Sequence, residues 1–122
     1  MAHVLLVTQD VHVRTVVNHL ARRRGYAVTL RESCTRAQSS PRRRWDIALL
    51  DLATHGDEGL SWIAEIGARA GRPKVVVIDR ITDEAGRDRL AQGMVAGADD
   101  FLAKPVIGNE AAAALDRLGF KP

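Results

Sequence analysis

Short apolar runs recur along the chain at intervals that suit a sheet of parallel strands. Each run is rich in valine, isoleucine or leucine and is too short to be a helix, which is typical of strands covered on both faces. On this pattern we expect five strands, at Val4–Val7, Ala27–Leu30, Asp46–Asp51, Lys74–Asp79 and Asp100–Ala103. The fifth of these depends mostly on the residues that surround it.

The segment after the first apolar run is amphipathic. Its apolar side chains recur at helical spacing, at Val13, Val16, Val17 and Leu20. Asp10 stands where a side chain can cap the first turn, and Gly25 stands where a helix can end. We therefore predict a helix between these two residues.

Three further helices are predicted in the same way. The first has an apolar face made of Leu60, Ile63, Ala64 and Ile66 and ends before Gly71. The next runs from about Asp83 to Val95, with Leu90, Met94 and Val95 buried and Gly97 at its end. The last, Asn109–Leu118, is rich in alanine and turns Leu115 and Leu118 inward. A short, poor helix is also expected at Thr35–Ser40.

Strands that alternate with helices predict right-handed crossovers and a doubly wound α/β sheet with helices on both faces. In such sheets the ligand site lies beyond the carboxyl ends of the strands, where the strand order reverses. That rule gathers six polar residues at one rim: Thr8, Gln9, Asp10, Asp51, Asp79 and Lys104. The chain of 122 residues is expected to form a single domain over residues 1–122.

Composition adds few constraints. With 46% hydrophobic and 27% charged residues the chain reads as an ordinary globular protein, and no apolar run approaches the roughly 20 residues that span a bilayer. A single cysteine, Cys34, suits a reducing compartment, so we expect a cytoplasmic protein and an unreactive thiol. The net charge of +3 includes the runs Arg22–Arg24 and Arg42–Arg44. No aromatic residues interleave these runs, so nucleic-acid binding is the least favoured function.

Two motifs resemble the receiver domain of two-component response regulators. One is Leu49–Leu52 followed by Gly56–Gly59, and the other is Ala96–Pro105. The resemblance covers nearly the whole chain and implies a flavodoxin-like (βα)5 fold. It implies that Asp51 is the phosphoacceptor, modified by a sensor histidine kinase or a phosphotransfer protein. It also implies that Lys104 contacts the phosphate and that Phe101 occupies the aromatic switch position.

The resemblance also implies Mg²⁺ at this site, but the ligand set is incomplete. The metal would be held by Asp51, by the carbonyl of Ala53 and by an acidic pair after the first strand. Thr8 and Gln9 occupy the acidic-pair positions. Gln9 could still hold Mg²⁺ through its amide oxygen or a water, and Asp10 suits a helix cap better than a metal ligand. Mg²⁺ binding is therefore a weak expectation.

The fourth strand departs from the family as well. Asp79 stands where the family has the serine or threonine of the switch, and Thr82 could substitute for it only through a shifted loop. Asp79 would either repel a phosphate on Asp51 or pair with Lys104. His55, four residues after Asp51, is expected to be an exposed loop residue rather than a ligand.

The leading hypothesis is a signalling module and not an enzyme. Its output surface would be the face of the fourth helix, fifth strand and last helix, where a homodimer is also plausible. The missing acidic pair and hydroxyl leave two versions open: weak phosphorylation on Asp51, or a pseudo-receiver that binds partners without phosphorylation. A small flavodoxin-like ligand-binding protein or enzyme is a less favoured alternative, because fold alone does not decide function.

Overall fold

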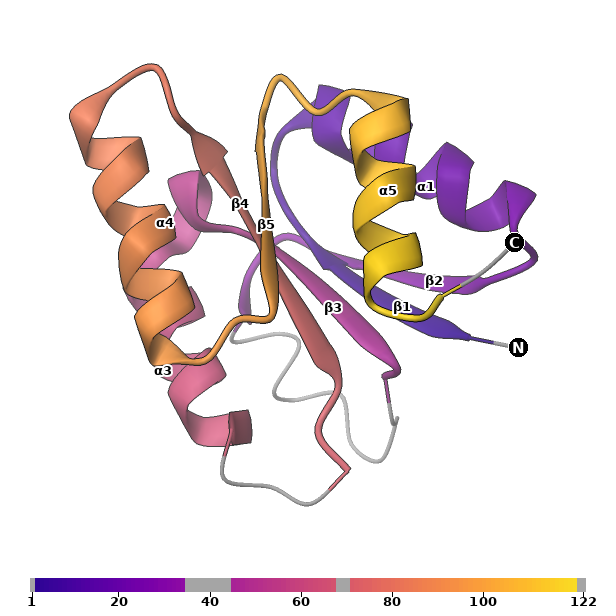
Figure 1. Cartoon of the computed structure of the whole chain (residues 1–122), viewed down its shortest axis with the longest axis horizontal. Helices are drawn as coiled ribbons and strands as arrows, with labels where there is room; N and C mark the ends of the chain where they lie inside the picture. The colour runs from indigo at the N-terminus through magenta and orange to yellow at the C-terminus, as the bar shows by residue number, and fades with distance from the viewer. Residues whose placement is uncertain (1, 35–44, 68–70, 121–122) are drawn as a thin grey trace.

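The computed structural model describes residues 2–34, 45–67 and 71–120 of the chain. They form a parallel sheet of five strands in the order β2-β1-β3-β4-β5 (Figure 1). The strands are β1 (His3–Val7), β2 (Ala27–Arg31), β3 (Ile47–Asp51), β4 (Lys74–Arg80) and β5 (Asp100–Lys104). Each lies within one residue of its predicted bounds. The predicted doubly wound sheet is confirmed.

Helices cover both faces of the sheet. They are α1 (Val11–Arg23), α3 (Leu52–Gly67), α4 (Glu84–Ala96) and α5 (Gly108–Arg117). Figure 1 shows α1 and α5 on one side of the sheet and α3 and α4 on the other. Alternate side chains of each central strand enter two separate cores, one with α1 and α5 and one with α3 and α4. The helix predicted at Thr35–Ser40 lies outside the described residues.

The predicted caps of α1 and α4 are present. The Asp10 carboxylate accepts hydrogen bonds from the backbone N–H groups of His12 and Val13, which satisfies two free donors of the first turn. Gly25 follows α1 with φ at +76°, a left-handed conformation that favours glycine. The cap predicted for α4, Gly97, follows the helix with φ at +128°. Asp83, predicted as the start of this helix, is its N-cap and accepts a bond from the N–H of Gly86.

The sheet-facing side of α4 differs from the prediction. Leu90 is buried as expected, but Met94 is 39% exposed and Val95 is 90% exposed. The buried positions beside Leu90 are the glycines Gly86 and Gly93. A Cβ atom at Gly93 would lie 3.0 Å from a methyl of Val77, so the helix backbone approaches the sheet too closely for a side chain there. Close packing through glycine turns the larger side chains outward.

Helix α3 begins at Leu52, directly after the last residue of β3, well before its predicted apolar face. Ile63 and Ile66 are buried as expected, whereas Ala64 is exposed and Trp62 takes an inward position. In α5, Leu115 is buried and Leu118 is half-buried. Over the described parts of the chain, no helix combines the length and apolar character needed to cross a membrane.

Candidate functional site

Parallel pairing brings the predicted polar residues to one edge of the sheet. Val7 pairs with Leu50, so Thr8 and Asp51 follow neighbouring positions of β1 and β3. Asp51 pairs with Ile78, the residue before Asp79. Because β1 lies between β2 and β3, this is the point where the strand order reverses, and a ligand site is expected there.

The carboxylate of Asp51 is buried and bound on both oxygens. Its Oδ2 accepts a hydrogen bond of 2.7 Å from the hydroxyl of Thr8 and lies 2.8 Å from Nζ of Lys104. Its Oδ1 accepts a bond of 3.1 Å from the backbone N–H of Ala53, in the first turn of α3. Three donors thus hold the Asp51 carboxylate in one orientation at the end of β3.

Lys104 lies between two carboxylates. Its Nζ is 2.8 Å from Asp51 and 3.0 Å from Asp10, and its side chain is only 13% exposed. Burial alone would lower the pKa of Lys104, but its hydrogen bonds to Asp51 and Asp10 raise that pKa above its ordinary value. The lysine therefore carries a firmly held positive charge beside Asp51.

Asp10 has two structural tasks at this rim. Burial opposes its charge, but the bond from Lys104 and the N–H groups of Val13 and His12 lower the pKa of the Asp10 carboxyl. One oxygen caps α1 while the other contacts Lys104. The expectation that Asp10 is a cap rather than a metal ligand agrees with these contacts.

Asp79 is fully buried and pairs with an arginine of α4. Its Oδ2 lies 2.5 Å from Nε of Arg89, and its Oδ1 accepts a bond of 3.1 Å from Nη2. The backbone N–H of Arg80 also donates to Oδ1. Of the two alternatives for Asp79, the one in which it pairs with Lys104 is wrong, because its cationic partner is Arg89. The hydrogen bond with Asp79 raises the pKa of Arg89.

Of the other predicted site residues, Gln9 and Thr82 follow strand ends at this edge, whereas Phe101 lies near the start of β5, paired with Val77. Gln9 is exposed beside Thr8, and Thr82 is exposed on the loop before α4. Phe101 is 45% exposed and lines a cavity of about 240 Å³ with Ile81, Met94 and other residues of α4. The side chain of His55 lies outside the described residues.

Sequence reasoning missed Arg89 and the hydrogen bond from Thr8. The signal for Arg89 was an acid at the end of a strand followed, ten residues later, by an arginine beside the buried Leu90. Apolar periodicity gave no reason to consider that pairing. Thr8 was counted as a lost carboxylate, although its hydroxyl is a donor that suits Asp51.

The donor set at this rim does not fit the Mg²⁺ site that the resemblance implies. Mg²⁺ is held in proteins mostly by carboxylate and other oxygen ligands in octahedral geometry. Asp51 accepts bonds from Thr8 and Ala53 and contacts Lys104, while Asp10 is engaged by its helix and by the same lysine. Among the described residues, no three acidic, histidine or cysteine side chains are grouped so as to hold a metal.

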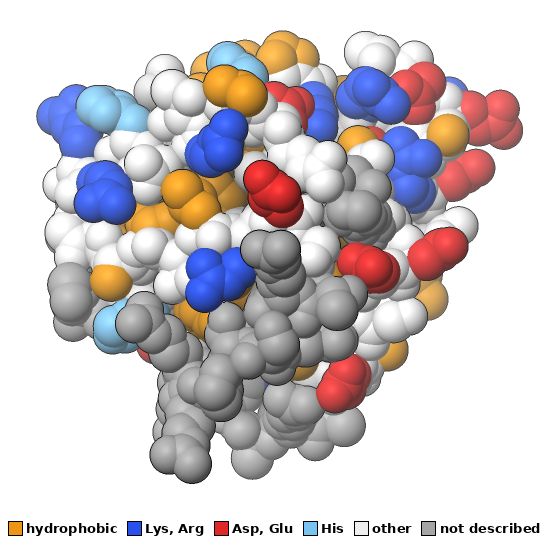
Figure 2. Space-filling model, turned by 180° about the vertical axis from the view of Figure 1, so that it is seen from behind, with side chains coloured by type: hydrophobic (Ala, Val, Ile, Leu, Met, Phe, Trp, Pro, Cys, Tyr) orange, Lys and Arg blue, Asp and Glu red, His pale blue; other side chains and the backbone are white. Residues whose placement is uncertain are grey.

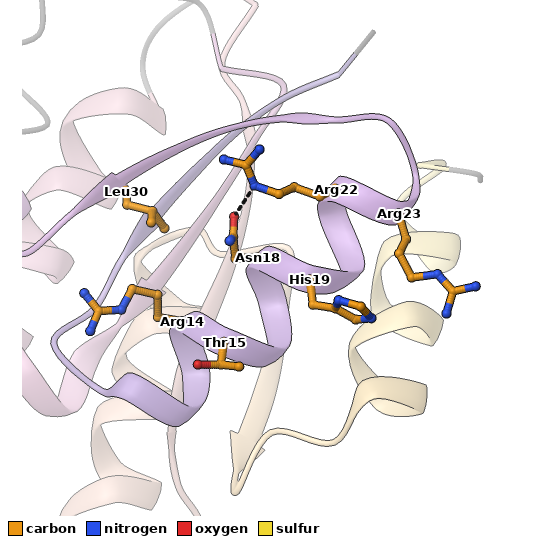
Figure 3. A pocket seen from close by; sticks show the side chains of 7 residues that line it. All are labelled: Arg14, Thr15, Asn18, His19, Arg22, Arg23 and Leu30. Atoms are coloured by element: carbon orange, nitrogen blue, oxygen red, sulfur yellow. Dashed lines mark hydrogen bonds between the residues drawn. The ribbon is translucent and has the colours of Figure 1, made fainter.

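A second surface feature lies on α1. Figure 2 shows basic and histidine side chains on the left of one face, and acidic side chains together with further basic ones on the right. The outer side of α1 and Leu30 of β2 line a shallow groove of about 600 Å³. Figure 3 shows Arg14, Arg22 and Arg23 in this groove, with Arg22 bonded to Asn18.

The groove does not strengthen the hypothesis of nucleic-acid binding, which remains the least favoured function. No phenylalanine, tyrosine or tryptophan lines it, so bases have no stacking platform. Arg24, the third arginine of the run, turns inward to contact Asp116 and has a side chain only 7% exposed. The run Arg42–Arg44 lies outside the described residues.

Comparison with known proteins identifies the family. Residues 4–116 match the response regulator receiver domain. The chain is 33% identical over 107 residues to the transcriptional regulatory protein CseB of Streptomyces coelicolor, covering 87% of this chain and 44% of CseB. It is 28% identical over 104 residues to the protein PetR of Rhodobacter capsulatus, covering 84% of this chain and 42% of PetR. The chain thus spans less than half the length of these relatives.

Solved structures agree. A receiver domain of a sensor histidine kinase from Pseudomonas aeruginosa, described with a magnesium ion in its active-site cleft, is 30% identical, with a TM-score of 0.79 and 96% of each chain covered. A chemotaxis response regulator of Vibrio cholerae has the same fold, with a TM-score of 0.77, 21% identity and coverage of 97% of this chain and 98% of that one. The chain therefore belongs to the receiver-domain family of two-component response regulators.

Proposed function

We propose that this receiver accepts a phosphoryl group on Asp51, with Lys104 as its phosphate partner and with weak dependence on Mg²⁺. The observation that carries the proposal is the contact of 2.8 Å between Oδ2 of Asp51 and Nζ of Lys104 at the switch point of the sheet. An oriented nucleophile beside a fixed cation is what transfer of an anionic group requires.

The proposed step joins Asp51 to the phosphoryl group of a phosphodonor. An Asp51 oxygen attacks phosphorus, a P–O bond forms, and the bond from phosphorus to the donor's leaving atom breaks with its electron pair. In phosphohistidine that leaving atom is an imidazole nitrogen. Lys104 offsets charge on the phosphoryl oxygens, while the Ala53 N–H and the Thr8 hydroxyl hold the carboxylate.

Exposed apolar side chains beside the site support docking of a protein phosphodonor. Val11, at the start of α1, is 64% exposed, and Ile107, just before α5, is 52% exposed. A contact of 3.1 Å between Nε2 of His12 and the carbonyl of Val106 joins the two segments that carry them. We infer that a sensor histidine kinase or phosphotransfer protein packs here, in the cytoplasm.

The proposed output face is the one formed by α4, β5 and α5. Met94, Val95 and Phe101 expose apolar side chains on these elements. We propose that partner binding or a homodimer covers this face. A change in the position of α4 would alter it directly.

A second candidate is a pseudo-receiver that binds its partner without phosphorylation. It is favoured by the fact that two cations at the rim already have carboxylate partners: Lys104 contacts Asp51 and Asp10, and Arg89 contacts Asp79. A phosphoryl group would have to compete for cations that already have partners. The family match favours either signalling role over a flavodoxin-like ligand-binding protein.

The test is phosphorylation by a small donor. Incubation with acetyl phosphate, with and without Mg²⁺, should add one phosphoryl group by intact mass. The adduct should vanish in Asp51→Asn and persist in Asp88→Asn, which changes an exposed acid on α4. No adduct on the wild-type protein at any Mg²⁺ concentration would leave the pseudo-receiver as the function.

A further inference from the structure

The position of Arg89 points to a role beyond its ion pair with Asp79. Its side chain crosses from α4 to α3, because a Cβ atom built on Gly56 would lie 3.0 Å from Cδ of Arg89. Gly56 is in the second turn of the helix that starts directly after Asp51. The arginine therefore approaches the rim from the side opposite to the α1 end where Asp10 lies.

The charges at the rim are unevenly matched. Among the residues that the structure describes there, three carboxylates, Asp10, Asp51 and Asp79, share two cations, Lys104 and Arg89. Phosphorylation would replace the single charge on Asp51 by about −1.5 to −2. Lys104 is already shared by two carboxylates. Neutralising the added charge therefore requires a second cation that can leave its carboxylate partner and bind the phosphoryl group. Arginine suits this task, because its planar fork binds a phosphate as it binds a carboxylate.

We propose that Arg89 is the second phosphate-binding cation of this receiver and that Asp79 is its counter-ion in the unphosphorylated state. This inference rests on the proposed role of Asp51. When Asp51 carries a phosphoryl group, the Arg89 guanidinium leaves Asp79, or is shared with it, and binds phosphoryl oxygens. Arg89 thus supplies positive charge in place of the metal ion that the incomplete ligand set would hold poorly.

The same exchange of partners disfavours phosphorylation, because Asp79 must give up its cation. Asp79 is fully buried, and without Arg89 its remaining described hydrogen bond comes from the N–H of Arg80. A buried carboxylate without a cation is strongly disfavoured. Asp79 therefore competes with the phosphoryl group for Arg89 and keeps phosphorylation weak. Since Arg89 is on α4, its exchange also couples Asp51 to the proposed output face.

This reasoning predicts opposite effects for the two partners. Arg89→Gln should lower the rate of Asp51 phosphorylation by acetyl phosphate roughly tenfold or more, since it removes a cation from the transferred group. Asp79→Thr should raise the rate severalfold, because Arg89 loses its competitor. Arg89→Lys should keep part of the rate. Arg87→Gln is the matched control, because Arg87 lies on the exposed side of α4 and donates to the carbonyl of Ile81.

The double variant Asp79→Thr/Arg89→Gln tests whether the gain acts through Arg89. It removes both charges, so it should fold even if Arg89→Gln alone does not. Under the proposal its rate stays near that of Arg89→Gln and the gain of Asp79→Thr disappears. A gain that persists in the double variant would show that Asp79 acts only by repelling phosphate, and would overturn the role of Arg89.

A spectroscopic readout separates phosphate binding from a structural role. The ¹H–¹⁵N resonance of Arg89 Nε should shift on phosphorylation of the wild-type protein, whereas that of Arg87 should not. If the wild-type protein forms an Asp51 adduct while the Arg89 resonance and the Arg89→Gln rate are unchanged, this inference fails and the proposed function stands. If no variant forms an adduct that depends on Asp51, both fail.

Discussion

Replacing Arg89 with glutamine should lower the free energy of unfolding by about 3 kcal/mol. Asp79 is 0% exposed, and Arg89 is its cationic partner at 2.5 Å. Breaking a buried pair from one side typically costs about 3–5 kcal/mol, because the other charge stays buried. We take the lower end, since 27% of the Arg89 side chain reaches solvent and water can enter beside the vacated position.

The neutral replacement should behave differently. Asp79→Thr removes the buried charge and leaves a partly exposed arginine, so its cost should stay near 1 kcal/mol, and the double variant should be similar. The two single substitutions are therefore not additive. The coupling energy between positions 79 and 89 should be about 2–3 kcal/mol.

Urea unfolding followed by tryptophan emission gives the measurement, because Trp62 of α3 is buried in the core that this helix forms with the sheet. With a slope of about 1.5 kcal/mol per molar urea, a loss of about 3 kcal/mol lowers the midpoint by about 2 M. Arg87→Gln should shift the midpoint little. A loss below about 1 kcal/mol in Arg89→Gln would refute the view that Asp79 depends on Arg89 for its charge.

Three further predictions concern the scaffold. Gly93→Ala should destabilise the domain by about 1 kcal/mol or more in urea unfolding, because the added Cβ would lie 3.0 Å from a valine methyl, while Gly67→Ala, with nothing within 4 Å, should not. Burial opposes the charge of Asp99, but its bidentate bond with Arg72 lowers the Asp99 pKa, so the stability that this pair contributes should be present at neutral pH and be lost as the pH drops below about 4. Asp99→Asn should reduce this loss of stability at low pH, and an unchanged pH dependence would contradict the assignment. Burial raises the pKa of Cys34 to about 11, so at pH 8 iodoacetamide should label it about a hundredfold more slowly in the folded protein than in urea, and equal rates would show that it is accessible.

Much of the scaffold could be read from the chain. Apolar runs such as Val75–Ile78 must be buried on both faces of the sheet, and this requirement predicted the bounds of each described strand to within one residue. Asp10 and Gly25 marked the ends of α1 because capping is a local interaction between near neighbours. The rule that ligand sites follow the carboxyl ends of parallel strands predicted that Asp51 and Lys104 lie close together, and they are in contact.

The partners within the rim were decided by tertiary structure. The sequence left open whether Asp79 repels a phosphate on Asp51 or pairs with Lys104, but α4 lies close enough to the sheet for Arg89 to pair with Asp79 instead. That approach depends on Gly86 and Gly93, whose lack of side chains lets the helix backbone approach the sheet and turns Val95 to solvent. Apolar periodicity places the large side chains of α4 on its sheet-facing side, and so it predicts the wrong rotation of this helix about its axis.

The chain by itself therefore determined the sheet, the helix ends and the acid–lysine pair that marks a receiver domain. Only the folded arrangement decided which cation neutralises each carboxylate, because the distance and rotation between two packed elements depend on the side chains of both. Asp79 and Arg89 are ten residues apart in sequence, but their contact depends on how α4 packs on Val77 and Leu52. That packing is a property of the whole domain and not of any local segment.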